Sequence, residues 1–116
     1  MPDAYGEQLA GWGKVVLLET TGRVSGRPVR TAVGFVDEPD GSLLVAAGSP
    51  SASWAANLLA DPACRGIIGE TTRVYRAEEL DGPDRACAIS GLILKYGTPA
   101  ESLGAGPAFR LRRVDD

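Results

Sequence analysis

The sequence predicts a small α+β protein that is mainly β: a barrel or half-open barrel of about six mostly antiparallel strands with two or three short helices. Short runs rich in valine, leucine and isoleucine recur along the chain, and turn residues separate most of them. Helical spacing of apolar residues occurs in only two or three short segments. Because 116 residues suffice for one hydrophobic core, we expect a single domain spanning residues 1–116.

The N-terminal third predicts a short helix, a strand and a turn. A helix over residues 4–11 would place Tyr5 and Leu9 on one face, together with Trp12 directly after it. We expect residues 1–12 to close one end of the barrel, with a substrate lid as the alternative. Residues 15–20 are short, apolar and partly β-branched, which predicts a buried strand. Residues 21–28 hold two glycines and a proline around a serine, which predicts a turn.

The next segments predict a hairpin. Residues 29–36 read as a second strand and residues 42–47 as a third, with Glu38-Pro39-Asp40-Gly41 as the turn between them. Three consecutive strands joined by tight turns predict an antiparallel meander.

The middle of the chain predicts a loop and a helix. Residues 48–53 are small and turn-forming, and residues 54–60 are rich in alanine and leucine. We expect Ser51 or Ser53 to cap this helix and Asp61-Pro62 to end it.

The C-terminal half predicts a strand pair, a helix and a last strand. Residues 63–69 and 72–80 read as the pair. A helix follows from residues 81–84, with an apolar face at helical spacing formed by Ile89, Leu92, Ile93 and Tyr96. Residues 97–107 read as a loop, and residues 108–114 alternate so that Phe109, Leu111 and Val114 face the core.

The absence of histidine excludes several kinds of site. It removes Ser-His-Asp and Cys-His nucleophile pairs, zinc sites that use histidine, and the commonest proton-transfer group at neutral pH. We expect no metal site. Chemistry has to come from a bound cofactor, backbone donors, hydroxyl groups or arginines.

Charge and cysteine usage restrict the kinds of binding partner and the cellular location that we expect. Twelve basic against fifteen acidic residues give a net charge of -3, which predicts no binding to nucleic acid. The longest uncharged run, residues 41–60, is interrupted by glycine, proline and asparagine, so we expect no stable membrane insertion. Cys64 and Cys87 form no CxxC motif and no secretory signal is visible, which favours reduced, partly buried thiols in a cytoplasmic protein. We expect a monomer or a homodimer.

One turn concentrates positive charge. Arg23, Arg27 and Arg30 fall within residues 23–30, where there is no acidic residue. Glycines let backbone N–H groups face a ligand, and hydroxyls and arginines add donors, so this turn suits a phosphate or carboxylate. A wide hairpin turn with solvated arginines is the alternative. Near the C-terminus, Arg112 and Arg113 read as solvated.

Two further candidates are aromatic. Trp54 follows a Ser/Gly/Pro loop and lines either a pocket for a flat ring or the buried face of its helix. Asn57, one turn later, either braces the preceding loop or contacts a ligand, and the brace is favoured. Tyr96 either faces a substrate and donates a proton or packs in the core, and the core is favoured.

The order of these blocks resembles the deazaflavin (F420)-dependent nitroreductase family, also called F420-dependent quinone reductases. The matching blocks are TTGRVSG at 20–26 with Arg27 and Arg30, VAAG at 45–48, and WAANL at 54–58 followed by Asp61-Pro62. The resemblance spans residues 15–114 and implies the split β-barrel fold, which is related to FMN-binding proteins. Three departures stand out: Val24 replaces a common lysine, the 48–53 loop is short, and Tyr96 is the one tyrosine in the region leading up to the last strand, where several tyrosines are usual.

The resemblance implies a hydride transfer from reduced coenzyme F420 to a small electron-poor acceptor such as a quinone, a nitro compound or an activated alkene. The cofactor-binding residues that it implies are Thr21, Gly22, Arg23, Ser25, Gly26, Arg27, Arg30, Ala47, Gly48, Ser49, Trp54 and Asn57, with Tyr96 as the catalytic candidate. FMN is the alternative cofactor. The alternative functions are ligand binding without turnover and action on one intermediate of a biosynthetic pathway.

Overall fold

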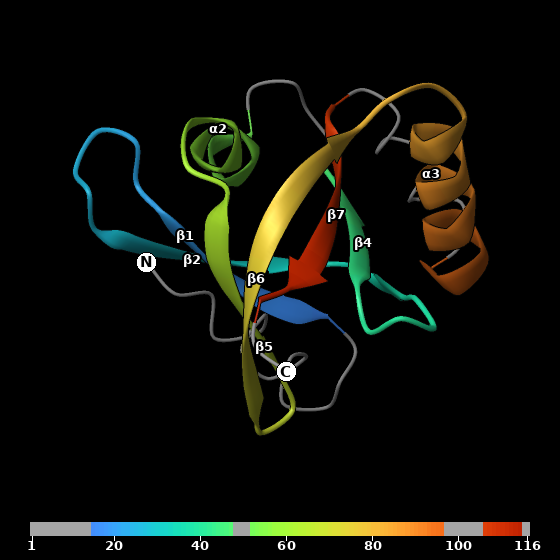
Figure 1. Cartoon of the computed structure of the whole chain (residues 1–116), viewed down its shortest axis with the longest axis horizontal. Coiled ribbons are helices and arrows are strands. Elements are labelled where there is room, and N and C mark those ends of the chain that lie inside the picture. Colours follow the sequence, from blue (N-terminus) through green and yellow to red (C-terminus); the bar gives the residue numbers. More distant parts are fainter. Residues whose placement is uncertain (1–14, 48–51, 97–105, 115–116) are drawn as a thin grey trace.

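The computed structural model describes residues 15–47, 52–96 and 106–114 (Figure 1). In chain order the elements are β1 (Val16–Thr21), β2 (Pro28–Val33), β3 (Val36–Asp37), β4 (Leu43–Ala46), α2 (Ser53–Ala60), β5 (Ala63–Ile68), β6 (Thr71–Leu80), α3 (Gly82–Tyr96) and β7 (Ala108–Arg113). Strands therefore dominate, as the sequence predicts.

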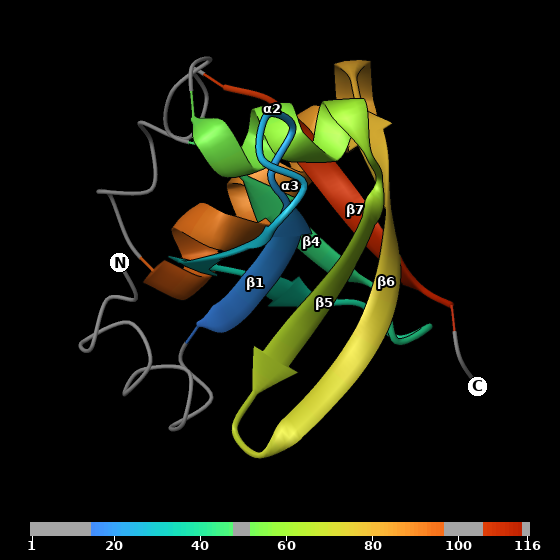
Figure 2. The same ribbon diagram turned by 90° about the vertical axis from the view of Figure 1, so that its left-hand side faces the viewer.

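The seven strands form one antiparallel sheet in the order β2-β1-β5-β6-β7-β4-β3. β2 and β3 lie at opposite edges of this sheet, yet only Gly34 and Phe35 separate them in the chain. Because consecutive Cα atoms are about 3.8 Å apart, three steps hold the two edges within about 11 Å of each other at this point. The sheet consequently curls into the half-barrel seen in Figures 1 and 2.

Two expectations about residues 29–47 were wrong. The predicted second strand is split into β2 and β3, which gives seven strands instead of six, and β4 pairs with β7 and β3 instead of continuing a meander from β2. The split falls at Gly34 and Phe35, and the Phe35 side chain is buried in the core. Its carbonyl oxygen accepts a hydrogen bond from Lys95 Nζ of α3 at 2.8 Å, and the same Nζ lies 3.6 Å from the centre of the Phe35 ring.

The main core fills the inside of the curled sheet. Its fully buried members come from β1, β4 and β7: Val16, Leu18, Val45, Phe109 and Leu111. α2 closes one end of this core through Trp54 and Leu58, and the Trp54 ring lies 6.0 Å from the Phe109 ring, centre to centre.

α3 covers the outside of the sheet over β4, β6 and β7 (Figure 1). A second cluster joins them: Leu44, Ala46, Leu80, Ala88, Leu92 and Ala108, with Ile89 and Ile93 packed against it. The predicted apolar face of this helix is therefore confirmed for these isoleucines and Leu92, whereas the Tyr96 side chain lies outside the described residues. No helix covers the outer face of β2, β1 and β5 in the described part of the chain.

Most predicted elements are confirmed, with two local corrections. The N-cap of α2 is Ala52, without a side-chain hydrogen bond, so Ser53 does not cap it, and Ser51 lies outside the described residues. β7 ends at Arg113, and Val114 is 61% exposed instead of facing the core. The predicted helix at 4–11 and the lid at 1–12 also lie outside the described residues.

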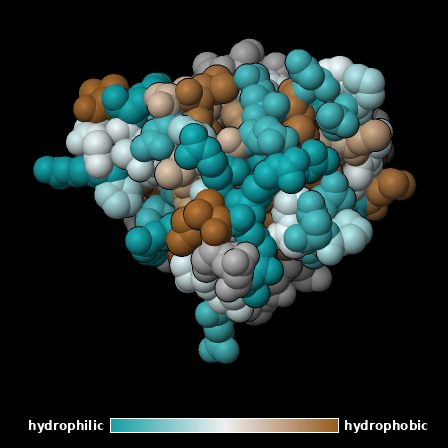
Figure 3. All heavy atoms as spheres, in the orientation of Figure 1, coloured by the Kyte–Doolittle hydropathy of each residue, from teal (hydrophilic) through white to brown (hydrophobic). Residues whose placement is uncertain are grey.

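The face of the molecule shown in Figure 3 is mostly polar, with apolar side chains scattered over it. The exposed large apolar residues come from different elements and include Val24 at 94%, Leu94 at 89% and Leu59 at 55% exposed. Single exposed apolar side chains of this kind are ordinary for protein surfaces. Neither described helix has the length and hydropathy needed to span a bilayer.

Candidate functional site

The candidate site lies at the end of the half-barrel that α2 covers. Because the sheet is antiparallel, β1, β4 and β6 end where β5 and β7 begin. The β1–β2 turn, residues 22–27, projects from this end beside α2 (Figures 1 and 2). The amide of Ala47 donates to the carbonyl of Pro107 at 2.9 Å, so the chain leaves β4 next to the point where it enters β7.

The β1–β2 turn requires glycine at two positions. Thr21 pairs with Pro28 as the last rung of the β1–β2 ladder. A Cβ on Gly22 would lie 2.7 Å from Ser25 Oγ and 3.2 Å from the Arg27 carbonyl oxygen, so a side chain there does not fit. Gly26 has a φ of 73°, a conformation that glycine adopts without steric cost. The two glycines of the motif thus serve the turn itself.

The backbone amides of the turn mostly bond within the protein. Gly22 N donates to Arg27 O and Gly26 N to Gly22 O, both at 2.8 Å. Arg27 N donates to Ser25 Oγ at 3.2 Å, and Arg23 N donates to Asn57 Oδ1 at 3.2 Å. The expectation that the glycines turn amides toward a ligand was therefore wrong for these four donors. The amides without a partner in the described part of the chain are those of Val24 and Ser25.

A buried amide side chain ties the turn to α2. Asn57 Oδ1 accepts hydrogen bonds from the Arg23 amide and from Arg23 Nη1, the latter at 2.8 Å, and Asn57 Nδ2 donates to Thr20 Oγ1 at 3.1 Å. Arg23 Nη1 also donates to the Ser53 carbonyl at 3.4 Å. Asn57 and Thr20 are each 2% exposed. We call this set of bonds the Asn57 clasp, and it braces the β1–β2 turn, whereas most of the loop before α2, which the sequence suggested as its partner, lies outside the described residues.

The three arginines of the turn region differ in their partners. Arg23 is engaged by the Asn57 clasp. Arg30 Nε lies 3.0 Å from Glu19 Oε2 in an ion pair across the β1–β2 ladder. The Arg27 guanidinium is exposed and has no partner within the described residues. Of the three charges that the sequence groups together, only that of Arg30 is paired with a described carboxylate, whereas Arg23 is held by neutral oxygens and Arg27 has no partner within the described residues.

The remaining predicted site residues are either buried in the core or lie outside the described residues. Ala47 is 1% and Trp54 8% exposed, and both belong to the main core. Gly48 and Ser49 lie outside the described residues. Tyr96 is the last residue of α3, and nothing is described of its side chain.

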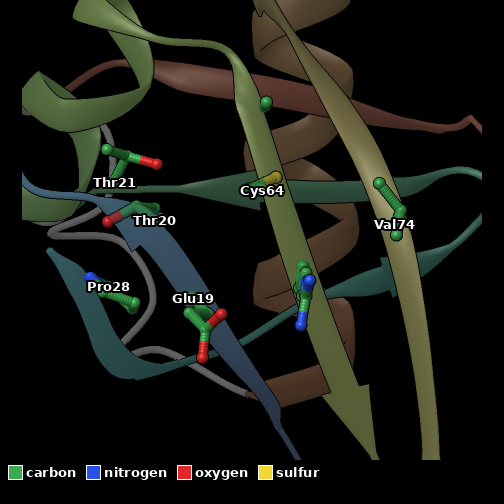
Figure 4. Close-up of a pocket in the computed structure, with 8 residues that line it drawn as sticks. Glu19, Thr20, Thr21, Pro28, Cys64 and Val74 are labelled. Carbon is green, nitrogen blue, oxygen red and sulfur yellow. The ribbon is translucent and has the colours of Figure 1, made fainter. Parts of the chain in front are cut away.

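A hollow of about 350 Å³ lies beside the turn, over β1, β5 and β6 (Figure 4). Its lining residues are Glu19, Thr20, Thr21, Pro28, Ala63, Cys64, Arg65 and Val74. Burial raises the pKa of the Cys64 thiol to about 12, with a further contribution from the Asp61 carboxylate, so this thiol stays protonated at neutral pH.

Sequence reasoning missed Glu19, Ala63, Arg65 and Val74 as members of one hollow. The one sequence pattern that concerns these residues is the alternation of side chains along β1. This alternation does not identify the strand that lies beside β1. The pairing of β1 with β5, which brings Glu19 opposite Arg65, appears only in the folded sheet.

A family model and one similar solved structure both point to F420-dependent reductases. A family model described as F420H(2)-dependent quinone reductase matches residues 3–96. A solved structure of an F420-H2 dependent reductase (FDR-A) is 27% identical, with a TM-score of 0.73, covering 85% of this chain and 94% of that one. No curated protein matches the sequence significantly.

Two other similar structures share the fold at lower identity. The haem storage protein HutZ of Vibrio cholerae is 20% identical, with a TM-score of 0.75, covering 95% of this chain and 88% of that one. A structure described as a domain-swapped dimer is 24% identical, with a TM-score of 0.73, covering 93% of this chain and 94% of that one.

Proposed function

The chain belongs to the F420H2-dependent quinone reductase family, and on this basis we propose that it transfers a hydride from reduced coenzyme F420 to a small electron-poor acceptor: a quinone, a nitro compound or an activated alkene. The observation that carries the proposal is the exposed β1–β2 turn, held rigid by its own hydrogen bonds and by the Asn57 clasp at the end of the barrel. A preorganised turn with an unpaired cation suits an anionic coenzyme because little ordering is left to lose on binding.

The donors of the turn fit one anionic group of the coenzyme. Arg27 supplies a guanidinium that is able to form two parallel hydrogen bonds to a phosphate or carboxylate. The amides of Val24 and Ser25 and the Ser25 hydroxyl lie in the same turn. When bound, F420 supplies the hydride chemistry, and the protein orients the coenzyme against the acceptor.

The other candidate residues take supporting roles in this proposal. Arg23 acts through Asn57 to hold the turn in place, and Arg30 adds charge while paired with Glu19. Ala47 and Trp54, which are buried in the main core, support the end of the barrel where the deazaflavin ring is proposed to bind, and Gly48, Ser49 and Tyr96 keep the ring and acceptor roles that the family resemblance implies. Thr21, Gly22 and Gly26 shape the turn.

Ligand binding without turnover is the second candidate. It is favoured by the same turn, in which Arg23 is engaged and Val24 occupies the exposed tip, so that Arg27 is the one guanidinium without a described hydrogen-bond partner among residues 22–27. The haem storage protein that shares the fold is a binding protein by its description. This chain, however, has no histidine, the residue that commonly ligates haem iron.

One pair of measurements distinguishes these candidates. The purified protein is titrated with oxidised F420 and, separately, with FMN, and reduced F420 is then mixed with menadione and its reoxidation followed by absorbance. We expect F420 binding and protein-dependent reoxidation. Binding without reoxidation with menadione, nitro and enone acceptors would leave the binding-protein candidate, and FMN binding without F420 binding would reject the cofactor assignment.

Two variants test the role of the turn. Arg27→Gln should weaken F420 binding by about tenfold or more, since a charge-assisted hydrogen bond contributes about 1.5–3 kcal/mol. Val24→Lys should strengthen it, more so at low salt. Val114→Lys adds the same charge at another exposed valine, 61% exposed, and serves as the control. Equal effects of the two lysine variants would show attraction by net charge alone.

A further inference from the structure

The hollow beside the turn lies on the outer face of the sheet, where alternate residues of neighbouring strands meet in rows. One row runs Pro28, Thr21, Ala63, since Thr21 pairs with Pro28 and the β1–β5 register continues to Ala63. The next row runs Arg30, Glu19, Arg65, Val74 across β2, β1, β5 and β6. Both rows contribute to the hollow of about 350 Å³ in Figure 4. No described helix covers this part of the sheet.

The charges in the second row do not cancel at the hollow. Glu19 stands between two arginines but bonds only to Arg30, at 3.0 Å, and its side chain is 18% exposed. Arg65 is exposed and has no hydrogen bond or ion pair within the described part of the chain. An uncompensated guanidinium therefore lines a hollow whose one carboxylate is already neutralised by Arg30 from outside.

The other lining side chains are small or apolar. Pro28, Ala63 and Val74 contribute little polarity, and Val74 is 39% exposed on this face. Thr21 adds a hydroxyl on the side toward the turn. Together with Glu19, Thr20 and Arg65, these residues make the lining an even mix of polar and apolar surface, and concave sites of a few hundred Å³ with a few convergent polar groups are typical of small-molecule binding.

We propose that this hollow is a binding site for a compact organic acid, with its carboxylate on Arg65 and the Thr21 hydroxyl and its apolar body over Ala63 and Val74. Arginine suits this role because its planar guanidinium matches a carboxylate with two parallel hydrogen bonds. The site is separate from Arg27 and the tip of the turn. It rests on the geometry of the sheet and does not depend on the redox activity proposed above.

The experiment uses 4-fluorobenzoate as the probe, followed by ¹⁹F NMR on the full chain at constant ionic strength, with 4-fluorobenzamide as its uncharged counterpart. We expect saturable binding of the acid, and at least tenfold weaker binding of the amide. Arg65→Gln should weaken binding of the acid at least tenfold. Arg73→Gln removes the same charge from the opposite face of the sheet and should change the affinity less than twofold. Circular dichroism checks that both variants fold.

The outcomes separate this site from the turn. Loss of binding in Arg27→Gln with no change in Arg65→Gln would overturn the proposal, as would equal binding of the acid and the amide. F420 binding is measured on the same Arg65→Gln protein, so failure of the proposed coenzyme site is seen independently. Displacement of the probe by F420 would identify the coenzyme's own acid groups as the occupant, and simultaneous binding would identify a separate acid such as the acceptor; either supports the site.

Discussion

Replacing Asn57 by alanine should weaken both the fold and the coenzyme-binding turn. The substitution removes the amide that accepts two hydrogen bonds from Arg23 and donates one to Thr20. These bonds join β1 and the adjacent β1–β2 turn to α2, which lies 34 to 37 positions further along the chain. No other side chain in the described part of the chain bridges the three.

The size of the effect follows from which partners water is able to reach. Arg23 is exposed, so water partly replaces its two lost bonds, each contributing about 0.5–1.5 kcal/mol net. Thr20 is 2% exposed, and leaving its hydroxyl without the amide donor costs about 1–3 kcal/mol. Bonds that share one side chain are not additive, so we expect a loss of about 2–5 kcal/mol in the free energy of unfolding.

The assay is urea unfolding followed by circular dichroism, with Asn57→Asp as the matched variant. Aspartate keeps an acceptor for Arg23, now as a charge-assisted bond, and the Thr20 hydroxyl is able to donate to its second oxygen. We therefore expect Asn57→Asp to lose less than about 1 kcal/mol, well below the alanine variant. At a temperature where Asn57→Ala remains folded, F420 should also bind more weakly to it than to the aspartate variant.

A double-mutant cycle with Arg23→Gln tests the reasoning itself. If Arg23 acts through Asn57, the two substitutions should be coupled by about 0.5–3 kcal/mol in both stability and F420 affinity. Additive effects on F420 affinity would mean that Arg23 contacts the coenzyme directly. An alanine variant that loses less than about 0.5 kcal/mol, or as much as the aspartate variant, would refute the energetic role of the clasp.

Three further substitutions or reactions test the fold. Gly66→Ala should lower the free energy of unfolding by about 1–3 kcal/mol, because the new Cβ would lie 2.9 Å from the Tyr75 ring; an unchanged urea midpoint would contradict this packing. Lys95→Met should cost about 1–2 kcal/mol through the lost hydrogen bond and ring contact at the β2–β3 bend, and urea unfolding that matches the parent protein would argue against it. At pH 8, one thiol, that of Cys87, should react with a disulfide reagent in the native protein, and two thiols should react in denaturant. The reason is that burial raises the pKa of the Cys64 thiol to about 12. Two fast-reacting thiols in the native protein would show that Cys64 is accessible.

Local patterns predicted most elements, but the strand order could not be read from them. The alternation of Val29, Thr31, Val33 and Phe35 continues through the point where β2 ends, and the one local sign of a break, Gly34, does not tell how the chain bends there. The bend is instead stabilised by Lys95, which is 60 positions further along the chain. Contacts of such separation are set by the packing of α3 against the sheet, and single-sequence patterns carry no record of them.

In the candidate site, too, the sequence predicted the types of residue but not all of their interaction partners. The motif identified the turn and its residue types, and one partner follows from local register: once Thr21 faces Pro28, Glu19 must face Arg30. The partner of Arg23 is not local, because Asn57 lies 34 positions away on α2. The sequence therefore predicted an arginine trio, whereas the fold divides it among a clasp, an ion pair and one unpaired cation.

The different partners of these three arginines affect how an anionic coenzyme is held. With valine at position 24 and the Arg23 guanidinium hydrogen-bonded to neutral oxygens, Arg27 is the one guanidinium of the turn that has no described partner, so we expect geometry to supply part of the affinity. The internal bonds of residues 22–27 supply this by fixing the turn before binding, which reduces the ordering cost. The part of the affinity that comes from the preformed shape depends weakly on salt, whereas the part that comes from the exposed charges of Arg23 and Arg27 is screened. A steep loss of F420 affinity with rising salt would show that the exposed charges dominate and would contradict a main contribution from geometry.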